Sequence, residues 1–154
     1  MDESLKMKLG KMDEKADEVI TGWSFGSLAG NLLPPPFDML AVASAFGAMG
    51  FKLSKVYEVP TTKGEMVRIG KVIAKGIASV TGAAYVGTSI FKYIPGVNIW
   101  VALLMQPVMV GAMAFSAGKT YKEYFHFRIS QGKELTDEEL RSIAEVALKK
   151  RVGK

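Results

Sequence analysis

The chain has 154 residues, of which 49% are hydrophobic and 23% charged, with a net charge of +5 and no cysteine. This length fits one domain with a real core, and the lack of cysteine excludes disulfides and thiolate metal sites. The positive charge predicts an anionic membrane surface as partner and not nucleic acid, because the basic residues lie beside apolar blocks and do not alternate with aromatic ones.

Charged and apolar residues are segregated along the chain. Ten of the first 18 residues are charged, whereas Asp38 is the single charge in residues 19–51 and Lys92 the single charge in residues 76–118. Long segments that almost lack charge are typical of buried or membrane helices, not of amphipathic surface helices. The sequence therefore predicts an all-α integral membrane protein built from helical hairpins.

Two helices are predicted in the first part of the chain. The first covers residues 4–33, with a polar first half and an apolar second half, and three consecutive prolines end it. The second begins at residue 36 or 37, where Asp38 suits the positive end of a helix, and runs to residue 57. The first hairpin turn is assigned to Pro34, Pro35, Pro36 and Asp38.

A second pair of helices follows a polar link. The third helix is predicted over residues 65–93 and the fourth over residues 97–127, with a kink at Gln106–Pro107. Asn98 occupies the position equivalent to Asp38, and capping of the following helix explains both residues. The second hairpin turn is assigned to Pro95, Gly96 and Asn98.

The last predicted helix is amphipathic. Thr136 followed three residues later by Glu139 forms a capping box, and the basic run at residues 149–151 suits the negative end of the helix. Residues 134–154 are therefore expected to be an exposed cytoplasmic helix beside a membrane domain of residues 1–130. Its predicted apolar stripe consists of Ile143, Ala144, Ala147 and Leu148.

The membrane domain is predicted to be an internal duplication, with repeats at about residues 4–57 and 65–127. Gly10–Lys11 recurs 60 residues later, and GAMGF at residues 47–51 recurs as GAMAF 64 residues later. The four-residue difference is about one helical turn, so both faces stay in phase. Chance alignment of segments rich in glycine and alanine is the alternative.

The four predicted apolar arms are short for a bilayer. They are 15, 15, 16 and 21 residues long, at residues 19–33, 37–51, 76–91 and 97–117, whereas a spanning helix usually needs about 20. Flanking lysines can snorkel and add reach. Two interpretations stay open: the arms span the membrane, or two hairpins wedge part-way into it.

The basic residues predict an orientation. Nineteen of the 20 Lys and Arg residues lie at the open ends of the hairpins, and only Lys92 lies near a tip. The positive-inside bias therefore places both termini and the 52–75 link in the cytoplasm.

Small residues four apart predict close helix packing in the membrane. The glycines assigned to this role are Gly22, Gly26, Gly30, Gly82 and Gly87. A glycine-tolerant soluble core is the less favoured alternative, because glycine costs helix stability in water. The polar residues Asn31 and Gln106 lie inside the apolar zones and are expected to form interhelical hydrogen bonds, with a pore lining as the alternative.

No motif predicts a catalytic residue, a cofactor or a metal. SAGKT at residues 116–120 resembles the end of a phosphate-binding loop, but Met113 replaces the required first glycine and a long apolar helix precedes it. The single histidine, His126, lies among aromatic residues and is interpreted as interfacial packing. No catalytic arrangement can be placed on one face, so an enzyme is the least supported class.

Three segments, LPPPFDMLAV, KYIPGVNIWVAL and SAGKTYKEYF, resemble the YcjF-type membrane domain, a family of unknown function often joined to Era-like GTPases. The resemblance covers about residues 15–130, and it matches Pro35 and Asp38 in one turn and Pro95 in the other. It implies a helical domain of the bacterial inner membrane and carries over no catalytic residues. The 154 residues include no GTPase domain, so a soluble GTPase is implied only as a possible separate partner.

These features predict a non-enzymatic, self-associating membrane scaffold or membrane-shaping protein, with membrane lipid and further copies of the chain as partners. A membrane anchor or regulator of a soluble partner, docked through residues 136–154, is one alternative. A small channel or transporter, suggested by the repeats and by Gln106, is the other.

Overall fold

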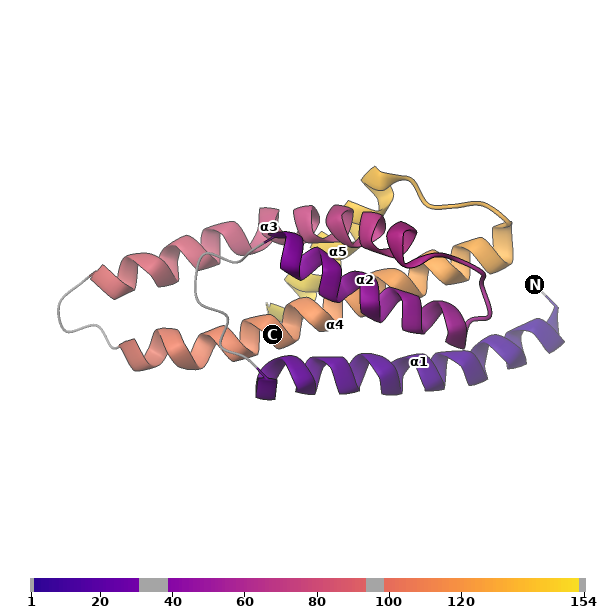
Figure 1. The fold of residues 1–154 in the computed structure, drawn as a ribbon, viewed down its shortest axis with the longest axis horizontal. Helices are drawn as coiled ribbons and strands as arrows, with labels where there is room; N and C mark the ends of the chain where they lie inside the picture. The colour runs from indigo at the N-terminus through magenta and orange to yellow at the C-terminus, as the bar shows by residue number, and fades with distance from the viewer. Residues whose placement is uncertain (1, 31–38, 94–98, 153–154) are drawn as a thin grey trace.

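The computed structural model of the chain describes residues 2–30, 39–93 and 99–152. Side chains are described for these residues except 24–30, 39–42, 78, 81–93, 99–110 and 152. This part of the chain is all helical, as predicted (Figure 1). The helices are α1 (Glu3–Gly30), α2 (Met39–Val56), α3 (Lys63–Tyr93), α4 (Ile99–Gln131) and α5 (Asp137–Val152).

Side-chain caps start two of the helices. The Thr136 hydroxyl accepts a hydrogen bond of 3.2 Å from the Glu139 backbone N–H, and the Glu139 carboxylate accepts one of 3.2 Å from the Thr136 backbone N–H. The predicted capping box of α5 is therefore confirmed. Thr62 caps α3 in the same way, accepting from the Glu65 N–H at 3.1 Å, and α3 begins two residues earlier than predicted.

The fourth helix is longer than predicted at its C-terminal end. It runs without a break from Ile99 through Pro107 to Gln131, four residues past the expected end. Gly132 ends it with a φ of 67°, a left-handed conformation that glycine adopts without strain. The Gly132 N–H donates to the Arg128 carbonyl at 3.0 Å, which satisfies one of the last free carbonyl groups.

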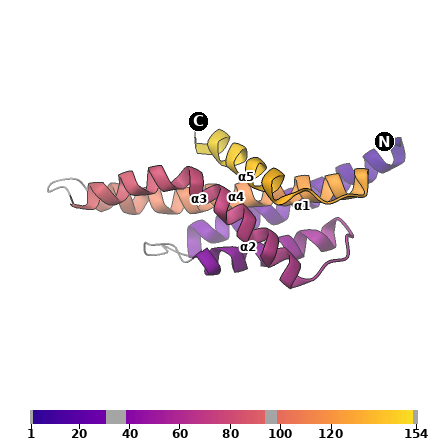
Figure 2. The same ribbon diagram turned by 90° about the horizontal axis from the view of Figure 1, so that it is seen from above.

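The helices pack around a central α3–α4 pair. Among the described residues, α1 packs mainly on α4 and α2 mainly on α3, so each helix of one hairpin pairs with a helix of the other. Helices α2 and α5 lie on opposite faces of the α3–α4 pair (Figure 2). The C-terminal part of α3 and the N-terminal part of α4 run together beyond the other helices at one end (Figure 1).

Aromatic rings fill the centre of the bundle. Phe125 is fully buried, and its ring stacks on Tyr57, the residue after α2, with centroids 5.5 Å apart and meets Tyr124 edge-on at 5.2 Å. Apolar side chains from all five helices complete the core, so the described part of the chain shares one contiguous core. They include Leu9, Ile20, Met49, Leu53, Met66, Ile69, Ile73, Tyr121, Leu140 and Leu148.

Glycines set the closest helix crossings. A Cβ on Gly70 of α3 would lie 2.6 Å from the Ala43 carbonyl oxygen of α2, and one on Gly47 would lie 2.8 Å from the Val67 Cα. On the other side of the bundle, a Cβ on Gly118 of α4 would lie 2.6 Å from the Ile20 side chain of α1. These three positions let backbones approach more closely than any side chain permits.

Helix α5 is part of this core and not a separate helix. Leu140, Ala144 and Leu148 are fully buried against α3 and α4, and Gly76 of α3 accommodates the Arg141 backbone of α5. The predicted apolar stripe is rotated in the structure to include Leu140, and its centre is covered by the chain itself. Ile143 and Ala147, at the edge of the stripe, stay half-buried.

Equivalent positions of the predicted repeats have similar surroundings. Met49 and Met113 are both buried, as are Tyr57 and Tyr121. The rings at Phe51 and Phe115 are partly buried, and each lies beneath a cationic side chain. These similarities accord with a duplication, which stays a prediction.

Among the residues whose side chains are described, no helix has the length and charge-poor, apolar composition of a membrane span. Most residues of the four predicted apolar arms lie outside that set. The integral membrane character therefore stays a prediction.

Candidate functional site

Most residues assigned to sites by the sequence fall outside the described part of the chain. The two predicted hairpin turns, with Pro34, Pro35, Pro36, Asp38, Pro95, Gly96 and Asn98, lie there, as does Asn31. Gly26 and Gly30 lie on α1, Gly82 and Gly87 on α3, and Gln106 on α4, all in segments described by their backbone alone.

Gly22 is the one predicted packing glycine whose surroundings are described. It lies on an exposed face of α1, and nothing in the described chain lies within 4 Å of a Cβ built there. Gly22 therefore makes no close crossing within this part of the chain. Its role in packing between copies stays a prediction.

The SAGKT segment is part of α4 and contacts α1. The Ser116 hydroxyl donates to the Ala112 carbonyl and the Thr120 hydroxyl donates to the Ser116 carbonyl, both at 2.8 Å and both buried. Gly118 lies against Ile20. Both hydroxyls are thus used within the helix, which accords with the rejection of a phosphate-binding loop.

A polar junction joins three helices at the charged end of the bundle. The Tyr57 hydroxyl, at the end of α2, donates to Asp13 Oδ1 of α1 at 2.6 Å. The Nε2–H of His126, on α4, donates to the same oxygen at 2.5 Å. The Asp13 and His126 side chains are 30% and 35% exposed, so the junction is open to solvent on one side. We call these three residues the polar junction.

The surroundings of the junction set the protonation states of Asp13 and Tyr57. Burial raises the pKa of Asp13, but hydrogen bonds from Tyr57 and His126 and the nearby charge of Lys122 outweigh it and hold the pKa below its ordinary 3.8. Burial first, and the bond to Asp13 second, raise the pKa of Tyr57 well above its ordinary 10.0. At neutral pH the carboxylate is therefore ionised and the phenol is a donor.

A second network lies where α4 ends and holds the loop before α5. The Arg128 guanidinium donates to the Tyr124 hydroxyl and to the Glu134 carboxylate, both at 3.0 Å. Glu65 of α3 lies 4.0 Å from the same guanidinium. These side chains satisfy one another, and this arrangement stabilises the loop.

The described residues hold no group of three or more His, Cys, Asp or Glu side chains that could bind a metal ion. His126 is bonded through Nε2 to a carboxylate and forms an edge contact with Tyr57 at 5.6 Å. The expected interfacial packing of His126 is thus joined by a hydrogen bond to Asp13 that no sequence pattern indicated.

The density of charged residues changes along the long axis of the bundle. On α4, Lys119 is the first charge after a segment with none, and on α3 the charges end at Lys75 apart from Lys92. The C-terminal end of α5 lies beside this boundary, because the Arg151 guanidinium carbon is 4.4 Å from the Phe115 ring centroid, one turn before Lys119. Basic side chains from two helices therefore lie where the almost uncharged parts of α3 and α4 begin.

Sequence reasoning missed the polar junction and the glycine crossings. Asp13 and His126 are 113 residues apart, and no local pattern pairs them. Gly47, Gly70 and Gly118 each lie four residues from an alanine, but other small residues of the chain share this spacing, so it did not single them out. The basic border beside Phe115 did have a signal in the sequence, the run of basic residues at 149–151, but that run was interpreted only as a helix end.

Comparison with protein-family models gave no match, and no solved structure matches. The chain is similar to Magnetosome membrane protein 22 of Magnetospirillum gryphiswaldense, with 26% identity over 114 residues. These residues are 73% of this chain and 58% of the relative, so the chain spans little more than half of that protein's length. The resemblance to the YcjF-type membrane domain stays a prediction.

Proposed function

We propose that this chain is a membrane-associated, non-enzymatic helical protein that acts as a scaffold or shapes the membrane. The observation that carries the proposal is the boundary between the charged body of the bundle and the almost uncharged parts of α3 and α4. The two segments run side by side and extend beyond the other helices (Figure 1). An elongated apolar end with a basic border suits a bilayer and its anionic surface.

The similarity to a protein named as a membrane protein supports this proposal. It extends over 114 residues, which is most of this chain. The inner membrane as location, cytoplasmic termini and a soluble GTPase partner belong to the same proposal and rest on the sequence alone.

Labelling of a single introduced cysteine tests the membrane association, because the chain has no cysteine of its own. A Val97→Cys variant, in the predicted second turn, is expressed in cells and treated with a membrane-impermeant maleimide, and membranes are then washed with carbonate. We expect a carbonate-resistant fraction. Labelling of intact cells would mean that the arms span the bilayer, and labelling only after lysis would mean a one-sided wedge.

The proposal is wrong if the full chain is released by carbonate and does not float with vesicles of any composition. A matched Lys133→Cys variant in the exposed loop after α4 is the control. It should be labelled only after lysis if the open ends of the hairpins face the cytoplasm.

A further inference from the structure

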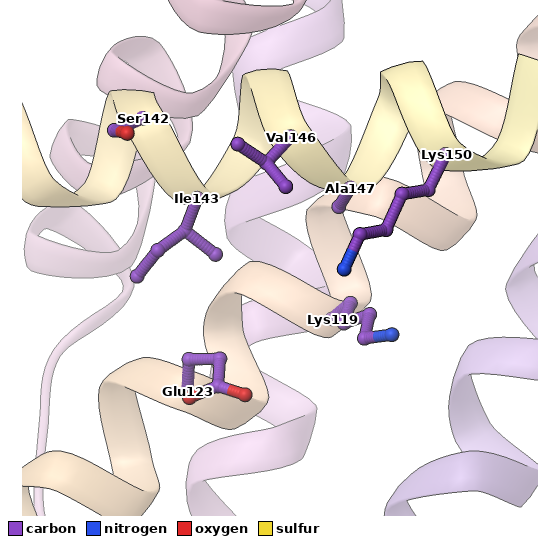
Figure 3. A pocket seen from close by; sticks show the side chains of 7 residues that line it. All are labelled: Lys119, Glu123, Ser142, Ile143, Val146, Ala147 and Lys150. Atoms are coloured by element: carbon purple, nitrogen blue, oxygen red, sulfur yellow. The ribbon is translucent and has the colours of Figure 1, made fainter. Parts of the chain in front are cut away.

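A shallow groove runs along the outer surface between α4 and α5. Its volume is about 260 Å³, and Figure 3 shows the side chains that line it. The floor is apolar, and Val146 is 48% exposed, one of two large hydrophobic side chains that the described part of the chain leaves open to solvent. We call it the α4–α5 groove; its lining residues are Lys119, Glu123, Ser142, Ile143, Val146, Ala147 and Lys150.

The charges of the groove are unevenly placed. Lys119 and Lys150 lie at one end, with the Lys150 ammonium directed toward Lys119, and Glu123 lies further along α4 (Figure 3). Neither lysine has an ion-pair partner in the described part of the chain, whereas Lys122 of the same helix pairs with Asp17 of α1 at 2.7 Å. Two unpaired cations on adjacent helices repel each other, and an anion between them would remove that repulsion.

The basic end of the groove faces the apolar part of the bundle. Arg151, one helical turn beyond Ala147, has its guanidinium 4.4 Å from the Phe115 ring centroid, so this side chain is held at the same end. From Phe115 back to Ile99, α4 has no charged residue. An anion at this end would therefore lie at the border between charged and apolar surface.

We propose that the α4–α5 groove binds an anionic phospholipid, with its phosphate between Lys119 and Lys150, its head group toward Val146, and its acyl chains toward Phe115 and the uncharged part of α4. The inference rests on the proposed membrane association and names the lipid class. An acidic protein segment fits less well, because an extended segment would also pass Glu123, whereas one phosphate occupies only the basic end.

The test places a reporter in the groove of the full-length protein. A Ser142→Cys variant is labelled with an environment-sensitive NBD fluorophore and mixed with vesicles of phosphatidylcholine alone or with 30 mol% phosphatidylglycerol, a composition chosen to give the surface a strong negative charge. We expect a blue shift with the anionic vesicles only. The double variant Lys119→Gln/Lys150→Gln should need about thirtyfold more anionic lipid for the same shift.

A charge-matched control separates this site from general attraction. The variant Lys11→Gln/Lys133→Gln removes two exposed lysines on α1 and in the loop after α4, and it should change the lipid requirement less than about threefold. Equal losses in both double variants, or no loss in the groove variant, would overturn the proposal. Glycerol phosphate at millimolar concentration should not displace the vesicles; if it does, the site binds a free phosphate and not a lipid.

Flotation of the same samples distinguishes membrane association of the protein from lipid binding in the groove. Protein that floats with neutral and anionic vesicles alike, with no shift at Ser142, keeps the membrane association and contradicts the groove. Protein that floats with neither contradicts both. If soluble polyglutamate shifts the fluorophore in the parent but not in Lys119→Gln/Lys150→Gln, and vesicles do not, the groove binds an acidic protein segment and the lipid proposal is wrong.

Discussion

Asp13 joins three helices through a single oxygen atom. The Tyr57 hydroxyl and the His126 Nε2–H both donate to Asp13 Oδ1, at 2.6 and 2.5 Å, from helices that follow α1 in the chain. Lys122 lies near enough to act on Asp13, and it forms its own ion pair with Asp17 at 2.7 Å. The carboxylate is thus the centre of the polar junction, and its charge strengthens both hydrogen bonds.

We predict that Asp13→Asn destabilises the protein by about 1 kcal/mol at pH 7, a value reduced for solvent screening of a partly exposed carboxylate. The folded pKa of Asp13 is below 3.8, so its contribution is complete above the unfolded pKa, about 3.9. It is lost as the pH falls through the folded pKa. Chemical unfolding of both proteins between pH 3 and 7 should show the difference closing at about pH 4 and below.

Asp17→Asn is the matched control. Its side chain is 64% exposed and, within the described part of the chain, pairs only with Lys122, so we expect a change of less than about 0.5 kcal/mol. Equal effects of the two substitutions would mean that the polar junction adds nothing beyond ordinary surface charge.

At the scale of the helix, glycines determine how closely α2 and α3 pack. Gly70 lies against the Ala43 carbonyl and within 3.1 Å of the Tyr121 hydroxyl, as measured from a Cβ built there. The Tyr121 hydroxyl itself donates to the Met66 carbonyl at 2.8 Å. A methyl group at Gly70 would therefore separate the two backbones and disturb a buried hydrogen bond.

We predict opposite effects for the same substitution at two glycines. Gly70→Ala should cost about 1–3 kcal/mol, because the crossing has no room for the methyl group. Gly10→Ala should add about 0.5–1 kcal/mol of stability, since alanine favours the helix and nothing lies within 4 Å of that position. Thermal unfolding followed by circular dichroism measures both. A stabilising Gly70→Ala would mean that the α2–α3 crossing is looser than described.

The capping box of α5 could be predicted from the sequence, but the face that the helix buries could not. Its capping box, Thr136 and Glu139, follows from sequence because both residues act within one turn. The face that it buries follows from its neighbours, since Gly76 of α3 leaves space for the Arg141 backbone. The apolar side chains of α5 that this contact leaves uncovered, Ile143 and Val146, form the floor of the α4–α5 groove.

At the scale of the whole molecule, the arrangement leaves Gly22, the first glycine of the predicted small-residue face of α1, uncovered by the described part of the chain. Gly22 is exposed and has no neighbour in the described chain within 4 Å of a built Cβ. A second copy of the chain could approach this face closely, and self-association through it is the part of the proposed scaffold that needs more than one chain.

We predict that Gly22→Leu weakens self-association in mild detergent by about tenfold, or about 1.4 kcal/mol, because the side chain keeps the partner backbone away. Sedimentation equilibrium measures the association. Gly10→Leu is the control, since that glycine is also exposed with nothing within 4 Å, and it should leave the association unchanged. A chain that is monomeric in several mild detergents would contradict self-association itself.

The sequence alone determined the local features. Helix content, the positions of the links and the cap at Thr136 were predictable, because each depends on residues within a few positions of one another. The division into charged and uncharged zones was also visible, since it is a property of the chain itself.

Only the tertiary structure decided which distant residues meet. Asp13 with His126, Gly70 with Ala43, and Lys119 with Lys150 are brought together by helix crossings. The predicted glycine spacing could not indicate these crossings, because spacing along one helix describes its face and not the partner that covers it. Pairing between helices depends on packing over the whole bundle, and that information is distributed along the entire chain.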